Sequence, residues 1–299
     1  MENCHPWRNR LLLAGAALLI GTILALLLTG FLQLIWSHRH GAFLPEPTEI
    51  SLAGLLEQPS LSSEDYTLLY HQTGLSPAAI DDYLEQGEDG RQAILKTAKG
   101  FHHAPEATCV SLIGGRFTCE DLLLNEEGKR VAAVPMAPLR AGDILLSFST
   151  HTLGWRHGHA GLVVDPVAGL VLEAVQLGEN SYQASTTHWR TYSNFLVLRV
   201  KDATQALGRK VADFAKRVLD GVPYSLLPGI VCPKGAPIEE TPGVHCAYLP
   251  WFAWQQQGVD LDGNGGAIVT VADLARSPRL EVVQVFGLDP SLLEDRQAA

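Results

Sequence analysis

The C-terminal half of the chain carries a thiol, an imidazole and a carboxylate, the side-chain types that covalent acyl transfer requires. Cys246 follows the Pro242-Gly243 break and precedes an apparent helix, where free backbone N–H groups and the helix dipole favour a thiolate. A thiol with a pKa of about 8.5 is only about 3% ionised at pH 7. A nucleophilic cysteine at this place therefore needs a basic partner.

A histidine and a glutamate on successive predicted strands are candidates for that partnership. His159 comes immediately before Ala-Gly-Leu-Val-Val, so its ring can project from a strand end toward a cleft. Glu173 lies within the next apolar run, and a carboxylate there must face solvent or hold a partner. Cys246, His159 and Glu173 would then be nucleophile, base and orienting acid. Each residue alone is also compatible with an inert thiol or a solvated strand residue.

We expect no metal ion and no cofactor from the sequence. Several histidines lie between residues 151 and 188, but no Cys-x-x-Cys or His-Glu-x-x-His spacing occurs. The segment from Asp260 resembles the start of a calcium loop, yet Val271 stands where a bidentate Glu is required. We predict a plain turn there. A Gly-x-Ser-x-Gly elbow and a phosphate loop are also absent from the sequence.

The elements that must position these residues follow from hydrophobic spacing. Helical periodicity occurs at 207–219 and at 245–258, where Gly258 is the expected stop. Segment 37–137 is predicted to be a linker and a small helical lead-in, with Ser76 as an N-cap and Pro77 after it. Short apolar runs predict four strands, at about 143–148, 160–165, 170–175 and 195–200. Strands followed by helices predict an α+β body.

An uncharged apolar run, Leu11 to Trp36, precedes these elements. Its 26 residues, at about 1.5 Å each, could cross a hydrocarbon core of about 30 Å. The run predicts one transmembrane helix at 11–36, with a cleaved signal or a buried helix as alternatives. Arg8 and Arg10 precede it, whereas residues 41–90 hold ten acidic residues. The positive-inside rule then makes 1–10 a cytoplasmic tail. The expected location is the cell membrane, single-pass, with the globular domain on the extracytoplasmic face.

The charge and the cysteines limit the function classes. The chain has 32 acidic and 22 basic residues, a net charge of −10 and no Lys/Arg cluster, so we expect no nucleic-acid partner. Five cysteines are too few for a disulfide scaffold. Pairing of Cys109 with Cys119 across a short loop stays open. A bridge between Cys232 and Cys246 would make Cys246 structural and is the alternative to catalysis.

The order of these motifs resembles that of the circularly permuted NlpC-like cysteine hydrolases, often called YiiX-like. The resemblance covers about 138–286 and rests on Gly142-Asp-Ile-Leu, His159-Ala-Gly-Leu-Val, Leu172-Glu-Ala, Pro223-Tyr and Cys246 ahead of a Trp-rich helix. In that family a papain-like fold is rearranged so that the histidine strand precedes the cysteine helix. The resemblance implies a permuted papain-like (NlpC-type) domain at 138–288 and a C-terminal tail at 289–299.

Carried over by position, the resemblance also implies roles for individual residues. His245 and Ala247 stand where the family has Tyr before the cysteine and Ser after it. A small residue after the nucleophile still allows backbone N–H groups to stabilise an oxyanion. The expected catalytic residues are Cys246, His159 and Glu173, and the expected substrate-binding residues are Tyr224 and His245.

The implied reaction is transfer of an acyl group to water through a thioester on Cys246. The substrate is left open between a cell-wall peptide amide, which unpermuted relatives cleave, and a lipid acyl or amide bond. Permuted relatives include acyltransferases that resemble lecithin retinol acyltransferase, and the expected membrane tether favours the lipid. The alternative function is a non-catalytic papain-like module that binds a peptide or lipid at the membrane.

Overall fold

Two antiparallel sheets carry the β-structure of the computed structural model, which describes residues 6–40, 43–111, 118–152 and 155–296. Within these residues the larger sheet has six strands in the order β10-β9-β3-β6-β7-β8. Their bounds are β3 Ile144–Ser147, β6 His159–Asp165, β7 Leu170–Glu173, β8 Tyr182–Ser185, β9 Phe195–Val200 and β10 Leu280–Phe286. The smaller sheet has the order β1-β2-β4-β5. Its strands are β1 Ala107–Ser111, β2 Thr118–Leu123, β4 Thr150–Thr152 and β5 Trp155–Arg156.

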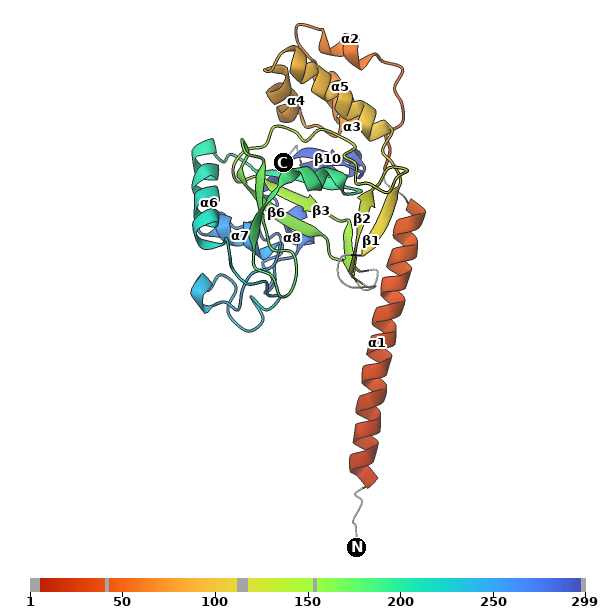
Figure 1. Cartoon of the computed structure of the whole chain (residues 1–299), viewed down its shortest axis with the longest axis vertical. Helices are drawn as coiled ribbons and strands as arrows, with labels where there is room; N and C mark the ends of the chain where they lie inside the picture. Colours follow the sequence, from red (N-terminus) through yellow and green to blue (C-terminus); the bar gives the residue numbers. More distant parts are fainter. Residues whose placement is uncertain (1–5, 41–42, 112–117, 153–154, 297–299) are drawn as a thin grey trace.

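Helices lie before, between and after these strands (Figure 1). The α-helices are α1 Pro6–His40, α2 Leu52–Leu56, α3 Ser63–Thr73, α4 Pro77–Leu84, α5 Glu88–His102, α6 Gln205–Val218, α7 Tyr248–Gln255 and α8 Val271–Ala275. Three short 3-10 segments of the described chain are η1 Thr186–Thr191, η2 Ile238–Glu240 and η3 Pro290–Arg296. This mixture of strands and helices confirms the predicted α+β class.

The larger sheet is covered on both faces, which explains why its strands are continuous apolar runs. Ile144 and Leu146 of β3 pack in one core with side chains of α6 and α7. Leu145, which points to the opposite face, packs in a second core with α3, α4 and α5. An antiparallel strand with one wet face would alternate apolar and polar residues instead.

The helices ahead of the sheets are tied to the larger sheet by specific contacts. Ser76 caps α4 by accepting a hydrogen bond from the N–H of Ala79, with Pro77 in the first turn, as the sequence predicts. Arg140 donates to both carboxylate oxygens of Asp82, at 2.9 and 3.0 Å. The predicted lead-in is not wholly helical, because its last part contains β1 and β2, and β2 pairs with β4 from beyond it. The boundaries predicted at 37–137 and 138–288 stay predictions.

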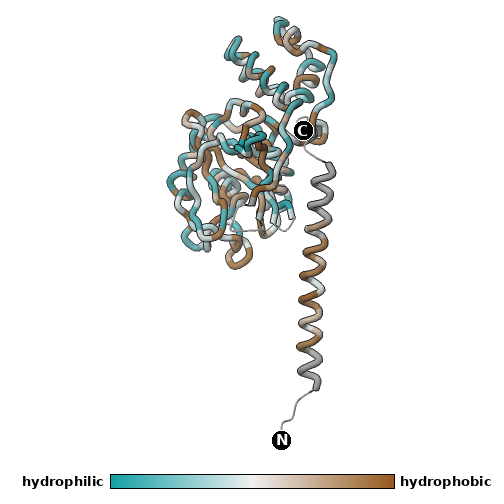
Figure 2. Tube along the Cα trace, turned by 45° about the vertical axis from the view of Figure 1, so that its right-hand side comes forward, coloured by the Kyte–Doolittle hydropathy of each residue, from teal (hydrophilic) through white to brown (hydrophobic). Residues whose placement is uncertain are grey.

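The predicted transmembrane helix at 11–36 is wrong, because no helix among the described residues is both long and apolar enough to cross a membrane. The side chains of α1 are described without a break from Leu12 to Leu28. Figure 2 shows hydrophobic colour along this stretch of α1. The expected membrane contact and extracytoplasmic location depend on that span, and nothing in the structure tests them. Residues 1–5 of the predicted tail 1–10, and 297–299 of the predicted tail 289–299, lie outside the described residues.

Candidate active site

The three predicted catalytic residues come from three separate elements of the larger sheet and its covering helices. His159 is the first residue of β6, Glu173 is the last residue of β7, and Cys246 lies two residues before α7. Gly161 of β6 pairs with Glu173 in the strand register. His159 and Glu173 therefore share one face of the sheet, because residues two apart on a strand point the same way.

His159 and Glu173 form a buried hydrogen-bonded pair. The Nε2 of His159 lies 3.1 Å from Oε1 of Glu173, and only 1% of Glu173 is exposed. Because an ionised carboxylate only accepts, this nitrogen carries the proton, which leaves Nδ1 of the neutral ring as the base. The ring also stacks on Trp189, with centroids 5.2 Å apart and planes 14° from parallel. Both contacts fix the orientation of the imidazole.

Gly161 has no side chain, and this leaves room for the contact between His159 and Glu173. A Cβ added there would lie 2.6 Å from Cγ2 of Val171 and 3.3 Å from Cγ of Glu173. We expect Gly161→Ala to lower the free energy of unfolding by about 1–3 kcal/mol through overpacking, measured by urea denaturation. Gly54→Ala is the matched control, because its Cβ would meet nothing closer than 3.6 Å. Equal stability of the two variants would contradict this role of Gly161.

A second histidine, His188 of η1, shares the same carboxylate. Its Nε2 lies 3.2 Å from Oε1 of Glu173, and its Nδ1 lies 2.6 Å from the carbonyl oxygen of Ser185. Both partners are acceptors, so His188 donates from both nitrogens and is an imidazolium. Burial opposes this charge, but the bond to Glu173 raises the pKa of His188. The sequence offers His188 only as a metal-ligand candidate, because its proximity to His159 through Glu173 arises from the fold.

The electrostatics of the site favour an ion pair between Cys246 and His159. Burial works against the thiolate, but hydrogen bonds from His159 and His245 lower the pKa of Cys246 to about 5. Burial also works against the imidazolium, but Cys246 and Glu173 raise the pKa of His159 to about 10. Burial raises the pKa of Glu173 while the two histidines lower it to a final value of about 2. The structure thus brings the predicted nucleophile, base and acid together.

The other cysteines of the described chain are free thiols, so neither the Cys109–Cys119 pair nor the Cys232–Cys246 bridge is formed. Cys109 differs from Cys246 in its surroundings. Partial desolvation of its sulfur and the neighbouring Cys119 thiol raise the pKa of Cys109 to about 12. The lowered pKa of Cys246 therefore distinguishes it from Cys109 as the candidate for a reactive thiolate.

Both predicted substrate-binding residues lie beside Cys246. His245 is buried, and its Nδ1 accepts a hydrogen bond of 3.3 Å from the N–H of Tyr248. Its Nε2 therefore carries the proton of the neutral ring. Tyr224 pairs with Val244 in a parallel bridge, and burial, together with the charge of Cys246, raises the pKa of Tyr224. The Nε2 of His245 is buried and has no nitrogen or oxygen atom as a hydrogen-bond partner among the described residues.

The turn that begins at Asp260 holds its side chains in protein contacts. Asp260 accepts from the indole Nε1 of Trp251 at 2.7 Å, and Asp262 pairs with Lys234. In this segment the carboxylates of Asp260 and Asp262 face protein donors, and the plain turn stays a prediction.

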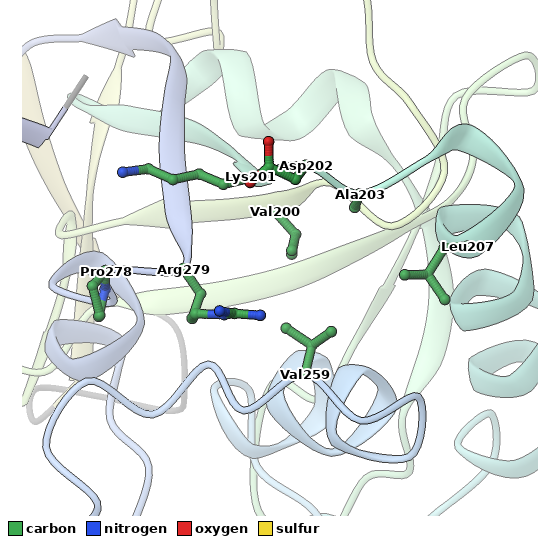
Figure 3. A pocket seen from close by; sticks show the side chains of 8 residues that line it. All are labelled: Val200, Lys201, Asp202, Ala203, Leu207, Val259, Pro278 and Arg279. Carbon is green, nitrogen blue, oxygen red and sulfur yellow. The ribbon is translucent and has the colours of Figure 1, made fainter. Parts of the chain in front are cut away.

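A pocket of about 250 Å³ is formed where the end of β9 meets the start of α6 and the chain around Val259 and Arg279 (Figure 3). It is lined by Val200, Lys201, Asp202, Ala203, Leu207, Val259, Pro278 and Arg279. Its lining contains neither a thiol nor an imidazole. The pocket therefore offers no nucleophile or general base of the kind that surrounds Cys246.

No family model matches the chain, and no curated protein matches it. Among solved structures it is similar to the metalloprotein yiiX from Escherichia coli O157:H7. The identity is 17%, the match covers 49% of this chain and 97% of that one, and the TM-score is 0.38. A similarity of this size carries no functional argument. Function must therefore be argued from the site itself.

Proposed function

We propose that the protein is a cysteine hydrolase that cleaves an amide or ester bond through an acyl-enzyme on Cys246. The observation that carries this proposal is the placement of His159 between a buried carboxylate and the thiol. Glu173 holds one ring nitrogen at 3.1 Å, and the pKa of Cys246 is lowered to about 5 by His159 and His245 against the effect of burial. Such a set is the arrangement that activates a thiol nucleophile.

In the proposed reaction the Cys246 thiolate attacks the substrate carbonyl carbon, and the carbonyl oxygen takes the negative charge. Backbone N–H groups at the start of α7 are the donors for this oxyanion. The His159 imidazolium gives its proton to the leaving amine or alcohol as the carbonyl–leaving-group bond breaks. A water then attacks the thioester while His159 takes one of its protons, and the acid product leaves with the thiolate regenerated. Glu173 and Trp189 keep the ring in place throughout.

The chain order of the three residues supports the resemblance to permuted NlpC-like hydrolases. His159 and Glu173 precede Cys246, and the cysteine lies directly ahead of α7. We propose that the domain has this permuted papain-like arrangement. A non-catalytic module with the same cleft would not need a depressed thiol pKa, so the lowered pKa of Cys246 favours the enzyme.

An exposed apolar loop next to the site supports a substrate with an acyl chain. The loop follows Tyr224, and its exposed side chains are Leu226, Leu227, Ile230 and Val231, at 53, 43, 59 and 63% exposure. Apolar side chains grouped at one loop are a feature of surfaces that contact lipid or other apolar ligands. We therefore favour a lipid acyl or amide bond over a cell-wall peptide amide.

Trapping the acyl-enzyme tests the proposal. The full chain is mixed with p-nitrophenyl acetate, butyrate or decanoate, quenched in acid, and mapped by peptide mass. We expect one acyl group on Cys246 and release of p-nitrophenol, with the rate rising from acetate to decanoate because the apolar loop contacts the chain. Acylation spread over several residues, or none, would refute the hydrolase. A rate that falls with chain length would refute the lipid preference alone.

A further inference from the structure

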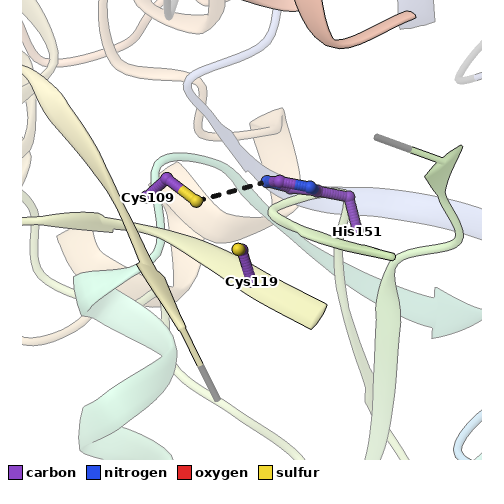
Figure 4. Close-up of side chains that lie close together, drawn as sticks. All are labelled: Cys109, Cys119 and His151. Atoms are coloured by element: carbon purple, nitrogen blue, oxygen red, sulfur yellow. Dashed lines mark hydrogen bonds between the residues drawn. The ribbon is translucent and has the colours of Figure 1, made fainter. Parts of the chain in front are cut away.

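Strand register gathers two cysteines and a histidine on one face of the smaller sheet, away from the catalytic residues. Cys109 of β1 lies opposite Asp121 of β2, and Cys119 of β2 lies opposite His151 of β4. Directly opposed residues share a face, as do residues two apart on one strand. Figure 4 shows both sulfur atoms and the imidazole pointing toward one another.

The ligand atoms of this cluster lie close to the separations of a tetrahedral site for a thiophilic cation. One atom from each of Cys109, Cys119 and His151 lies within 4.8 Å of the other two. The Sγ of Cys109 is 3.9 Å from Nε2 of His151. Zn–S bonds of about 2.3 Å and Zn–N bonds of about 2.0 Å give tetrahedral edges of about 3.5–3.8 Å. The separation of Cys109 and His151 is already close to such an edge, and the other separations would need to shorten by at most about 1 Å.

The same register argues against a disulfide between the two thiols. Because Cys109 opposes Asp121, Cys119 is its diagonal neighbour, two residues along β2. Diagonal pairs across antiparallel strands have Cα atoms about 7–8 Å apart. A disulfide needs about 4.4–6.8 Å. A metal ion between the sulfurs spans the diagonal without moving the strands.

Buried charges hold the imidazole in this position. The Oδ1 of Asp121 lies 3.2 Å from Nε2 of His151, and both residues are buried. Arg156 of β5 donates to Oδ2 of Asp121 at 2.6 Å, which fixes the carboxylate. Because this bond uses the same Nε2 that faces the Cys109 thiol, a zinc ion bound there would take the place of the Nε2 proton, and Asp121 would remain beside the ion as a neighbouring carboxylate. Cys109 is exposed, so the cluster is open to an ion from solvent on that side.

We propose that Cys109, Cys119 and His151 bind one zinc ion, with the fourth position open to water. Two thiolates and one neutral imidazole are the donor set that zinc prefers over magnesium or calcium, which take oxygen ligands. The ion would fasten β1 and β2 to β4. Strand β4 is in turn joined to the residue before His159, because the N–H of Gly158 donates a 3.0 Å hydrogen bond to the carbonyl oxygen of Thr150.

Cobalt and zinc titrations of the full chain test this site. The protein is reduced, stripped with a chelator and titrated with Co²⁺, whose thiolate complexes give a charge-transfer absorption and intense visible bands when tetrahedral. We expect one equivalent to bind and Zn²⁺ to displace it. Cys109→Ser, at an exposed position, is expected to weaken binding by at least about 100-fold.

Two further cysteine variants make the test specific. Cys232→Ser and Cys246→Ser each remove a free thiol outside the cluster and are expected to keep the cobalt spectrum. Loss of the spectrum in Cys246→Ser with retention in Cys109→Ser would overturn the proposal, as would a Cys109–Cys119 disulfide in the protein mapped without reduction. The spectrum does not depend on ester hydrolysis, so this site and the proposed enzyme can fail separately.

Discussion

Cys246→Ser is expected to lower kcat/KM for p-nitrophenyl butyrate by about 10⁴-fold or more and to leave the fold intact. A serine hydroxyl in the same place is not ionised near neutral pH, so the charge that His159 and His245 stabilise on sulfur disappears. Loss of the nucleophile in a hydrolase of this kind typically abolishes nearly all covalent catalysis, because the other catalytic groups contribute to the rate only together with the nucleophile. Steady-state kinetics of both chains, with far-ultraviolet circular dichroism of each, measure the effect.

Cys232→Ser is the matched control for this result. It makes the same chemical change at another free and partly exposed cysteine, and we expect its kcat/KM to stay within about two-fold of the parent, as surface substitutions away from the chemistry usually do. A fall of less than about ten-fold in Cys246→Ser, or an equal fall in both variants, would show that Cys246 is not the nucleophile.

His159→Ala is expected to move the midpoint of thiol alkylation by iodoacetamide from about pH 5 to about pH 8.5. The lowered pKa of Cys246 arises from His159 and His245 against burial, and without the imidazolium the thiol returns toward its ordinary value. The direction of this pH dependence follows from the negative charge of the thiolate. In the parent chain it persists above about pH 5 and is lost as the pH falls through that value.

The pH midpoint of alkylation distinguishes the two chains more clearly than the alkylation rate at a single pH. At pH 6 a thiol with a pKa of about 5 is about 90% ionised, whereas one with a pKa of about 8.5 is about 0.3% ionised. A more basic thiolate is also more nucleophilic, with a Brønsted slope of about 0.4–0.5, so the thiolate of the variant reacts about 40-fold faster than that of the parent. The net loss of rate at pH 6 is therefore only about ten-fold. His103→Ala, which removes an exposed histidine, should leave the midpoint unchanged, and an unchanged midpoint in His159→Ala would refute the ion pair.

The catalytic residue types and the local elements were accessible from the sequence. Ser76 and Pro77 identified the start of α4, and apolar runs identified the positions of β3, β6, β7 and β9, because caps and periodicity are local properties. The candidate triad could be predicted because a glutamate within an apolar strand needs a polar partner when it is buried, and the neighbouring strand supplies a histidine. The hydropathy of residues 11–36 predicts a membrane span that no helix of the described residues provides.

The sequence by itself determined the α+β class, the caps and the identity of Cys246, His159 and Glu173 as candidates. Only the tertiary structure decided that His188 shares Glu173, that Trp189 supports the ring of His159, and that Cys109, Cys119 and His151 form a cluster. The physical reason is strand register. Spacing along the chain shows which way a side chain points on its own strand, but hydrogen bonds between strands determine which distant side chains meet.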